Sequence, residues 1–323
     1  CHTALTNLID QWLINVNNNE ITGAVFVDFA KAFDVINHSL LLKKLKIYGL
    51  SHNTLKLMSS FLSERKQIVT DSGNKSALLA NNYGVPQGSV LGPILFSIYI
   101  NDLPLSVNSP CELFADDTTV HTSHSHLNDV YSALQDSIGQ LVEWSELNHM
   151  CLHPPKTKVL IITTRQKRQN LPVNSLSIYI NGNVIEEVDH HKILGITIDN
   201  NLSWMHHVSM LCKKVSKCIY QLSKIKHFLD LHSRKIFFNA YIESHMSYAS
   251  TIWDSASANV LKPLLSLHRR ALKLVLLKSS TLAISDYRAL NILPLKTKLK
   301  FNKAMFMFKI MSGFAPPSLQ NRF

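Results

Sequence analysis

The sequence predicts an α+β fold, in which an antiparallel sheet backed by helices is followed by a region built mainly from helices. Short apolar runs rich in β-branched and aromatic residues alternate with helical stretches over residues 1–200, a mixture typical of a split βαβ arrangement. After Trp204 the strand signals become sparse, and apolar residues recur at every third or fourth position. We therefore expect two domains, at residues 1–200 and 201–323.

Strand and helix signals can be placed in order along the first domain. The expected elements are strand 24–29, helix 39–48, a helix that follows Gly88 and runs towards Leu103, a hairpin centred on Asp116 and Asp117, helix 127–148 and strand 159–163. Asn181-Gly182 predicts a second hairpin between 177–180 and 184–185, because this dipeptide suits a two-residue turn. A last strand is expected at 193–198.

A loop that contains glycine and proline precedes the helix after Gly88. Gly84, Pro86 and Gly88 interrupt regular structure, and Ser89 is the expected N-cap. Free amides at such a helix start can accommodate an anionic or nucleotide partner.

The second domain opens with an amphipathic helix. Its apolar positions are Val208, Leu211, Val215, Ile219, Leu222 and Ile225. This spacing places them on one helical face. Further helices are expected at 233–248, 259–277 and 296–311.

Length and composition are compatible with one large core or two domains, since the chain has 323 residues and is 46% hydrophobic. No apolar run reaches the roughly 18 to 20 residues of a membrane helix, and no secretion signal opens the sequence. These features predict a soluble protein without a membrane partner. Because the sequence begins with Cys1 rather than Met, we interpret it as a fragment of a longer polypeptide.

The five cysteines include no CxxC pair, and their odd number fits free thiols in a reducing compartment. His121, His124 and His126 raise the alternative of a zinc site, but no paired cysteine spacing supports it. We expect them to be solvated loop histidines.

Charge is distributed unevenly along the chain, whose formal net charge is +11. Residues 1–120 hold 8 Lys and Arg against 10 Asp and Glu, whereas the remainder holds 25 against 12. The basic residues of the second domain include Lys213, Lys214, Lys217, Lys224, Lys226, Arg234, Lys235, Arg269, Arg270 and Lys273. Their clustering predicts sequence-independent, salt-sensitive binding to nucleic acid, with an ordinary solvated basic face as the alternative.

Three aspartates stand at the ends of apolar, strand-like runs. Asp28 follows 24–27, and Asp116 and Asp117 follow Leu113-Phe114-Ala115. Carboxylates brought together in a water-poor cleft repel one another, and a divalent cation neutralises them. Two such cations can serve an in-line phosphoryl displacement. For Asp116-Asp117 alone, a simple hairpin turn is the competing interpretation.

These segments together resemble the reverse transcriptases of non-LTR retrotransposons, and are most similar to those of jockey-like elements. The resemblance rests on Val27–Asp34, Gly84–Phe96 and Phe114–Asp117, and continues through Trp144, Asn148, Pro154–Thr157, Lys192–Asp199 and Leu202–Trp204. It implies a right-hand polymerase palm with incomplete fingers and a primer-grip hairpin, followed by a helical thumb and C-terminal extension.

The resemblance also implies roles for single residues. Asp28 and Asp116 would be the main ligands of two Mg²⁺ ions, with Mn²⁺ as a possible substitute, and Asp117 a nearby carboxylate. The backbone carbonyl of Phe29 would complete one metal shell. Phe33 would be the steric gate that excludes a ribose 2′-hydroxyl; a plain core residue is the alternative.

Two further segments are implied to contact the nucleotide. Gln87 and Gly88 match positions along the template base and incoming nucleotide. Lys156 matches a lysine near the triphosphate, a proton donor or charge partner for the leaving pyrophosphate, although it could be a plain surface lysine. His153 stands where the family usually has Asn, so the sequence departs from the pattern there.

The implied activity is that of an RNA-directed DNA polymerase with RNA template, DNA primer or target, and dNTP as partners, acting within a nuclear and cytoplasmic ribonucleoprotein. The upstream fingers and an endonuclease are expected in the rest of a longer polyprotein. The alternative is a catalytically silent remnant that binds RNA or DNA through its basic helices. An RNA-dependent RNA polymerase is disfavoured by Phe33, and a nucleotidyl cyclase by the 84–96 block.

Overall fold

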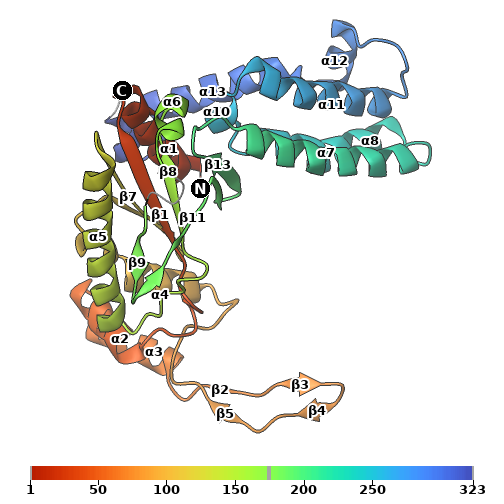
Figure 1. The fold of residues 1–323 in the computed structure, drawn as a ribbon. Coiled ribbons are helices and arrows are strands. Elements are labelled where there is room, and N and C mark those ends of the chain that lie inside the picture. Colours follow the sequence, from red (N-terminus) through yellow and green to blue (C-terminus); the bar gives the residue numbers. More distant parts are fainter. Residues whose placement is uncertain (1, 173–175, 322–323) are drawn as a thin grey trace. The chain divides into compact units, whose positions relative to one another are not determined.

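The computed structural model describes residues 2–172 and 176–321, which form two compact units (Figure 1). One unit holds residues 15–188, and the other joins the residues up to Ile14 to those from Asp189 onwards. The division therefore falls after Val188, not at the predicted 200/201 boundary. The reason is that the hairpin after Asp189 packs against the helix that follows it and does not join the large sheet.

The unit of residues 15–188 is built on a five-stranded sheet with the order β11-β8-β1-β7-β6. The central strand β1 (Ile21–Val27) is buried along its whole length and pairs antiparallel with β7 (Asp117–His124) and β8 (Lys158–Ile162). β6 (Cys111–Phe114) pairs antiparallel with β7, as predicted for a hairpin. β11 (Glu186–Glu187) runs parallel to β8, so the expectation of a purely antiparallel sheet is wrong at this edge.

The long helix α5 (Leu127–Leu147) packs against β1 and β7, as Figure 1 shows. Gly23 permits this close approach, because a Cβ atom there would lie 2.6 Å from Leu134 Cδ1 and 2.7 Å from Val130 Cγ1. Tight helix-on-sheet packing thus explains a glycine in the middle of a buried strand, where glycine is otherwise unfavourable.

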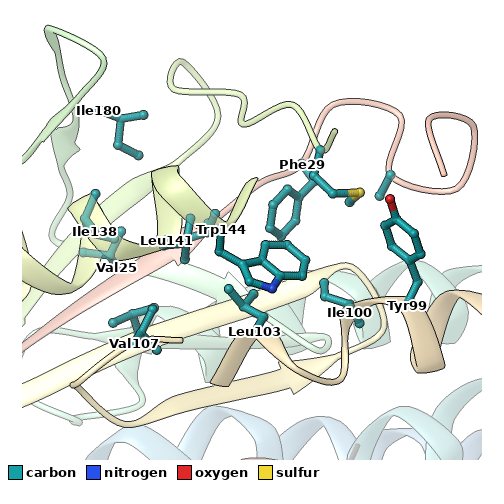
Figure 2. Packing of buried hydrophobic residues seen from close by; sticks show 14 of the residues in the cluster. Val25, Phe29, Tyr99, Ile100, Leu103, Val107, Ile138, Leu141, Trp144 and Ile180 are labelled. Carbon is teal, nitrogen blue, oxygen red and sulfur yellow. The ribbon is translucent and has the colours of Figure 1, made fainter. Parts of the chain in front are cut away.

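Three more helices complete the core of this unit: α2 (His38–Ile47), α3 (His52–Leu62) and α4 (Leu91–Ile100). Figure 2 shows part of the apolar cluster, including Trp144 and Tyr99. The buried Lys44 links α2 to α4 and to the residues that follow α4. Its Nζ donates to the Tyr99 carbonyl at 2.7 Å and to the Asp102 carboxylate at 2.8 Å. Trp144 Nε1 donates to the same carboxylate at 3.2 Å, which ties α5 to this network.

Residues 66–80 form a narrow β arm that the sequence did not predict. β2 (Lys66–Gln67) pairs with β5 (Leu79–Ala80), and β3 (Thr70–Asp71) pairs with β4 (Asn74–Lys75). All eight residues of these strands are exposed, so the arm lacks the alternating burial on which strand prediction depends. Helix α3 was also absent from the expected elements.

The remaining elements of this unit are short. They are η1 (Leu103–Leu105), α6 (Arg165–Gln169), β9 (Tyr179–Ile180) and β10 (Asn183–Val184). The Asn181-Gly182 hairpin is confirmed, because Asn183 pairs with Ile180 and Val184 with Tyr179. The helix after Gly88 ends at Ile100, short of the expected Leu103.

The other unit is mostly helical, as predicted for the C-terminal part. Its long helices α7 (Met205–Ile225) and α11 (Ala258–Leu276) lie side by side (Figure 1). The other helical segments are α1 (His2–Asn17), α8 (Leu231–Phe237), η2 (Phe238–Glu243), α9 (Ser244–Ser247), α10 (Ser250–Trp253), α12 (Ile284–Leu290), α13 (Leu295–Met311) and α14 (Pro317–Gln320). Three residues of α1, Asn15 to Asn17, fall in the first-described unit.

Two expectations for this unit are wrong in detail. The single strand at 193–198 is a hairpin of β12 (His190–Ile193) and β13 (Ile196–Asp199), because Leu194 and Gly195 have φ values of 45° and 83° and form its turn. The expected helix 233–248 contains the π-helical segment η2, which periodicity alone does not reveal.

Across the two described stretches, none of the helices combines the length and apolar character needed to cross a lipid bilayer.

Candidate active site

Asp28 and Asp117 come together because β1 and β7 are antiparallel neighbours. Val27, the last residue of β1, pairs with Thr118, so Asp28 and Asp117 each lie one residue beyond the last pair of this ladder, and the charge of Asp28 acts on Asp117. Opposed residues of an antiparallel ladder project from the same face of the sheet. The register alone therefore places two carboxylates side by side, although 89 positions separate them in sequence.

Asp116 lies in the turn that joins β6 to β7. Phe114 pairs with Asp117, which leaves Ala115 and Asp116 as the two turn residues, and Ala115 has a φ of 52°. The predicted hairpin is thus present but centred one residue earlier than expected. The turn leaves Asp116 exposed beside the pair formed by Asp28 and Asp117.

The negative charges of Asp116 and Asp28 act on the carboxyl group of Asp117. Partial burial raises the pKa of Asp117 above its ordinary value, and the negative charges of Asp116 and then of Asp28 raise it further. Asp28 Oδ2 is itself buried and has no hydrogen-bond donor. An acidic cluster with an unsatisfied oxygen is costly without a cation.

The turn that carries Lys156 is anchored on the backbone of Asp28. The Asp28 amide donates to Thr157 Oγ1 at 3.2 Å, and the Asp28 carbonyl accepts from the His153 amide at 2.8 Å. Thr157 Oγ1 in turn donates to the His153 carbonyl. This arrangement brings Lys156 Nζ to 3.8 Å from Asp28 Oδ2. Thr157 is fully buried, and sequence reasoning gave it no role although it lies in a quoted segment.

Phe29 follows Asp28 and lies opposite the 151–153 segment. The residues on either side of Phe29 bond to the 151–153 segment, through the Ala30 amide and the Asp28 carbonyl. Phe29 itself forms a bridge with Leu152 in which the backbone N–H and C=O of Phe29 point away from that segment. The Phe29 carbonyl is therefore not used in bonding to the 151–153 segment.

The loop at 84–89 is fastened to the segment after Phe33. The amides of Gly84 and Val85 donate to the carbonyls of Ile36 and Phe33 at 2.8 and 2.9 Å. Gly84 has a φ of 73°, and a Cβ there would lie 2.7 Å from Asp34 Cα. Only glycine fits this close contact of two backbones.

Side chains make two more links across this junction. The Phe33 ring stacks on Phe96 of α4, with ring centres 4.3 Å apart. Gln87 Nε2 donates to Asp34 Oδ1 at 2.9 Å. Asp34 was quoted within a motif, but no signal in one sequence marked it as the partner of Gln87.

The start of α4 differs from the prediction by one residue. Val90 occupies the N-cap position without a side-chain bond. Ser89 Oγ nevertheless accepts from the Gly92 amide at 2.9 Å, so the expected capping interaction is made from one position upstream. A Cβ at Gly88, whose φ is 82°, would have no other atoms within 4 Å, so the space beside this residue is open.

Comparison with known proteins decides the family. The model of the family described as reverse transcriptase (RNA-dependent DNA polymerase) matches residues 4–198, more than half of the chain. The chain belongs to the reverse transcriptase family.

Among curated proteins this reverse transcriptase is similar to the RNA-directed DNA polymerase from mobile element jockey of Drosophila funebris, with 27% identity over 80% of this chain and 29% of that protein. It is also 32% identical to the Drosophila melanogaster protein of the same name, over 60% of this chain and 21% of the relative. The chain thus spans less than a third of the length of these relatives.

Among solved structures, the reverse transcriptase chain is similar to telomerase from Candida albicans in complex with a fragment of telomeric RNA. The TM-score is 0.45 with 12% identity, over 88% of this chain and 54% of the telomerase chain.

Reverse transcriptases generally use divalent metal ions, and the acidic cluster can be tested for that role. In the described part of this chain, no three His, Cys, Asp or Glu side chains form a ready-made metal cage. Two carboxylates with further oxygens from phosphates and water suit Mg²⁺ better than a full protein cage. The buried, unpartnered Oδ2 of Asp28 fits a cation in this position.

Six of the basic residues predicted to bind nucleic acid fall into two groups by their exposure. Lys213, Lys214, Lys217 and Lys224 are exposed on α7, and Lys226 is the half-buried C-cap of this helix. Arg234 is buried, and its guanidinium donates to the carbonyls of Val275, Lys226 and Leu229. The prediction that Arg234 binds nucleic acid is therefore wrong, because its guanidinium donates to carbonyl groups inside the helical unit.

The histidine expectation is also partly wrong. His121 is not in a solvated loop but is buried on β7, and burial lowers its pKa to about 4. Strand β7 extends through His124, so two of the three histidines lie within the sheet.

Proposed function

We propose that this chain is the core of an RNA-directed DNA polymerase of the non-LTR retrotransposon kind. A primer 3′-hydroxyl attacks the α-phosphorus of a deoxynucleoside triphosphate, the new phosphodiester forms, and pyrophosphate leaves. Membership of the reverse transcriptase family and the meeting of Asp28 with Asp116 and Asp117 support this proposal. In it, residues 15–188 supply the palm with partial fingers, and the helices after Trp204 supply the thumb.

In the proposed site, Asp28 and Asp116 would hold two Mg²⁺ ions, and Asp117 and the Phe29 carbonyl would be further oxygen ligands. Bound Mg²⁺ supplies neutralisation of phosphate charge and activation of the attacking hydroxyl. Lys156, anchored through Thr157 and His153, would stabilise or protonate the leaving pyrophosphate. Its short distance to Asp28 supports this placement.

The neighbouring loop would shape the nucleotide pocket. Phe33, backed by Phe96, forms a rigid wall, and such a wall would exclude a ribose 2′-hydroxyl. Gln87 and Gly88 would contact the base pair, which the open space at Gly88 permits to approach closely. Lys213, Lys214, Lys217, Lys224 and Lys226 would contact phosphates of the template and primer.

Primer extension on an RNA template with Mg²⁺ and dNTP tests the proposal. The 323-residue chain is compared with a longer chain that also carries the region upstream of the matched segment in the jockey relative. Synthesis is expected from the longer chain, and Asp116→Ala should abolish it. Asp136→Ala is the matched control, because Asp136 is an exposed carboxylate on α5.

Synthesis that persists in Asp116→Ala would remove the assigned role of the cluster. If neither chain makes DNA but both retain salt-sensitive RNA binding, the silent-remnant interpretation replaces the polymerase.

A further inference from the structure

The side chains of Asp34 and Gln87 form a polar contact at the junction between the Phe33 turn and the 84–89 loop. Gln87 Nε2 donates to Asp34 Oδ1 at 2.9 Å, and both residues are exposed. No other side chain of the described residues bonds to the Asp34 carboxylate. The contact therefore joins two segments that border the candidate nucleotide pocket, at a point open to a ligand.

This hydrogen bond is not needed to hold the loop in place. The amides of Gly84 and Val85 already bond to Ile36 and Phe33, and the His38 ring bonds to the Gly84 carbonyl at 2.7 Å. Gly84 also packs against the backbone of Asp34 too closely for any larger residue. Since the backbone fixes the loop, the Asp34 carboxylate acts mainly on the side chain of Gln87.

The Asp34 carboxylate and the Gln87 amide differ in the hydrogen bonds that they can make, and this difference favours one orientation of the amide. A carboxylate only accepts hydrogen bonds, whereas a primary amide carries donors on nitrogen and an acceptor on oxygen. If the Gln87 amide turned over, its oxygen would face the Asp34 oxygen and the two would repel. Asp34 thus turns Gln87 Nε2 towards itself, which leaves Oε1 and the second N–H of the amide for a ligand.

We propose that Asp34 is a positioning residue that fixes the orientation of the Gln87 amide and so sets which hydrogen-bonding groups meet the incoming nucleotide and its template base. This inference rests on the proposed polymerase function, because that function places Gln87 at the nucleotide. It assigns to Asp34 a role in how tightly and how accurately the paired dNTP is bound, and none in the chemical step.

Asp34→Asn tests whether Asp34 sets the orientation of the Gln87 amide or only attaches the 84–89 loop. Asparagine keeps the size and hydrogen-bonding capacity of the side chain, but it can donate to Gln87 Oε1 as readily as it accepts from Nε2. The amide then has two allowed orientations. A residue that only held the loop would tolerate this change, whereas a residue that sets amide polarity would not.

The longer, jockey-extended chain is used to measure dNTP incorporation by wild type and variants. In Asp34→Asn we expect the KM for the correctly paired dNTP to rise about three- to tenfold, misincorporation to rise, and kcat and Tm to stay near the wild-type values. Asp34→Glu keeps an acceptor-only group and should recover most of the KM. The double variant Asp34→Asn with Gln87→Glu restores a hydrogen bond of reversed polarity, and should stay impaired.

A second measurement does not depend on activity. In the 323-residue chain labelled with ¹⁵N at glutamine side chains, the Gln87 amide signal is identified by its loss in Gln87→Ala. One of its two protons should exchange slowly in wild type and lose this protection in Asp34→Asn.

The outcomes are distinct. An unprotected amide in wild type, or an unchanged KM and error rate in Asp34→Asn, would overturn the role of Asp34 while the polymerase function stands. Absence of DNA synthesis by wild type would overturn the polymerase function and the role together, even with a protected amide.

Discussion

The ammonium nitrogen of Lys156 lies 3.8 Å from Oδ2 of Asp28, a carboxylate oxygen that is buried and has no hydrogen-bond donor. The pair is held by backbone geometry, because the residues between His153 and Thr157 form a turn bonded to the Asp28 backbone. Both side chains remain accessible, with 67% of Lys156 and 41% of Asp28 exposed. Such a pair contributes little to stability and is better suited to a charged ligand.

Lys156→Gln should therefore lower the rate of DNA synthesis and leave the fold intact. We expect kcat to fall by about tenfold or more while Tm changes by less than about 1 °C. Lys43→Gln is the matched control, because Lys43 is an exposed lysine on α2, away from the 153–157 turn. Equal kcat values for wild type and Lys156→Gln would contradict a role at the pyrophosphate.

Replacing Phe33 by valine should admit ribonucleotides. The ring of Phe33 stacks on Phe96, and its loss would open the space next to the sugar. The ratio of kcat/KM for a dNTP to that for the matching NTP should fall by about tenfold or more, as for loss of a steric barrier of at least 1.4 kcal/mol. Phe33→Tyr keeps the aromatic wall and should retain the discrimination. Unchanged sugar selectivity in Phe33→Val would show that Phe33 is only a core residue.

Gly84 and Gly88 offer a matched pair of substitutions, because both have positive φ angles, of 73° and 82°. Alanine in this conformation costs roughly 1 kcal/mol of unfolding free energy at either position. At Gly84 the new Cβ would also meet the Asp34 backbone at 2.7 Å, whereas at Gly88 it would meet nothing within 4 Å. We expect Gly84→Ala to cost roughly 3 kcal/mol in total, as measured by urea unfolding. Similar losses in the two variants would contradict the close packing of the two loops.

His207 makes the helical unit sensitive to acid. Burial, and to a lesser degree the charge of Lys214, lowers the pKa of His207 from 6.5 to about 4, and its Nδ1 accepts from the Thr197 amide. The unfolded chain therefore takes up a proton at higher pH than the folded chain. The stability that neutral His207 contributes is complete above pH 6.5 and is lost as pH falls from 6.5 to about 4.

His207→Gln removes this titration while glutamine can still accept from the Thr197 amide. The unfolding free energy of wild type relative to the variant should fall by roughly 3 kcal/mol between pH 7 and pH 4, measured by denaturant unfolding. Parallel pH profiles for the two proteins would mean that the pKa of His207 is the same in the folded and unfolded chain, which would contradict the lowered pKa.

Much of the site was predictable because it lies on elements with strong local signals. The apolar run before Asp28 and the hairpin at Asp116 are short-range patterns, and each appears within three residues of its expected place. The two segments meet because β1 and β7 are neighbours in the sheet. A single sequence does not specify this strand order. The resemblance to a known family supplied that information.

Other features depend on tertiary contacts and had no sequence signal. The arm at 66–80 lacks a buried face, and the π-helical segment at 238–243 keeps the apolar spacing of an α-helix. Arg234 looks like any surface arginine in sequence, yet its guanidinium satisfies three carbonyl groups inside the helical unit. The compact units divide after Val188, upstream of the 200/201 boundary, because the 190–199 hairpin has strand character but packs with helices.

Binding of Mn²⁺ in the presence of a non-hydrolysable dNTP tests most directly whether Asp28 and the Asp116-Asp117 turn form one cation site. Electron paramagnetic resonance counts the bound ions without requiring DNA synthesis. We expect wild type and Asp136→Asn to bind Mn²⁺ with the nucleotide, and both Asp28→Asn and Asp116→Asn to weaken this binding by at least about tenfold. Undiminished Mn²⁺ binding in Asp28→Asn and Asp116→Asn would contradict the account.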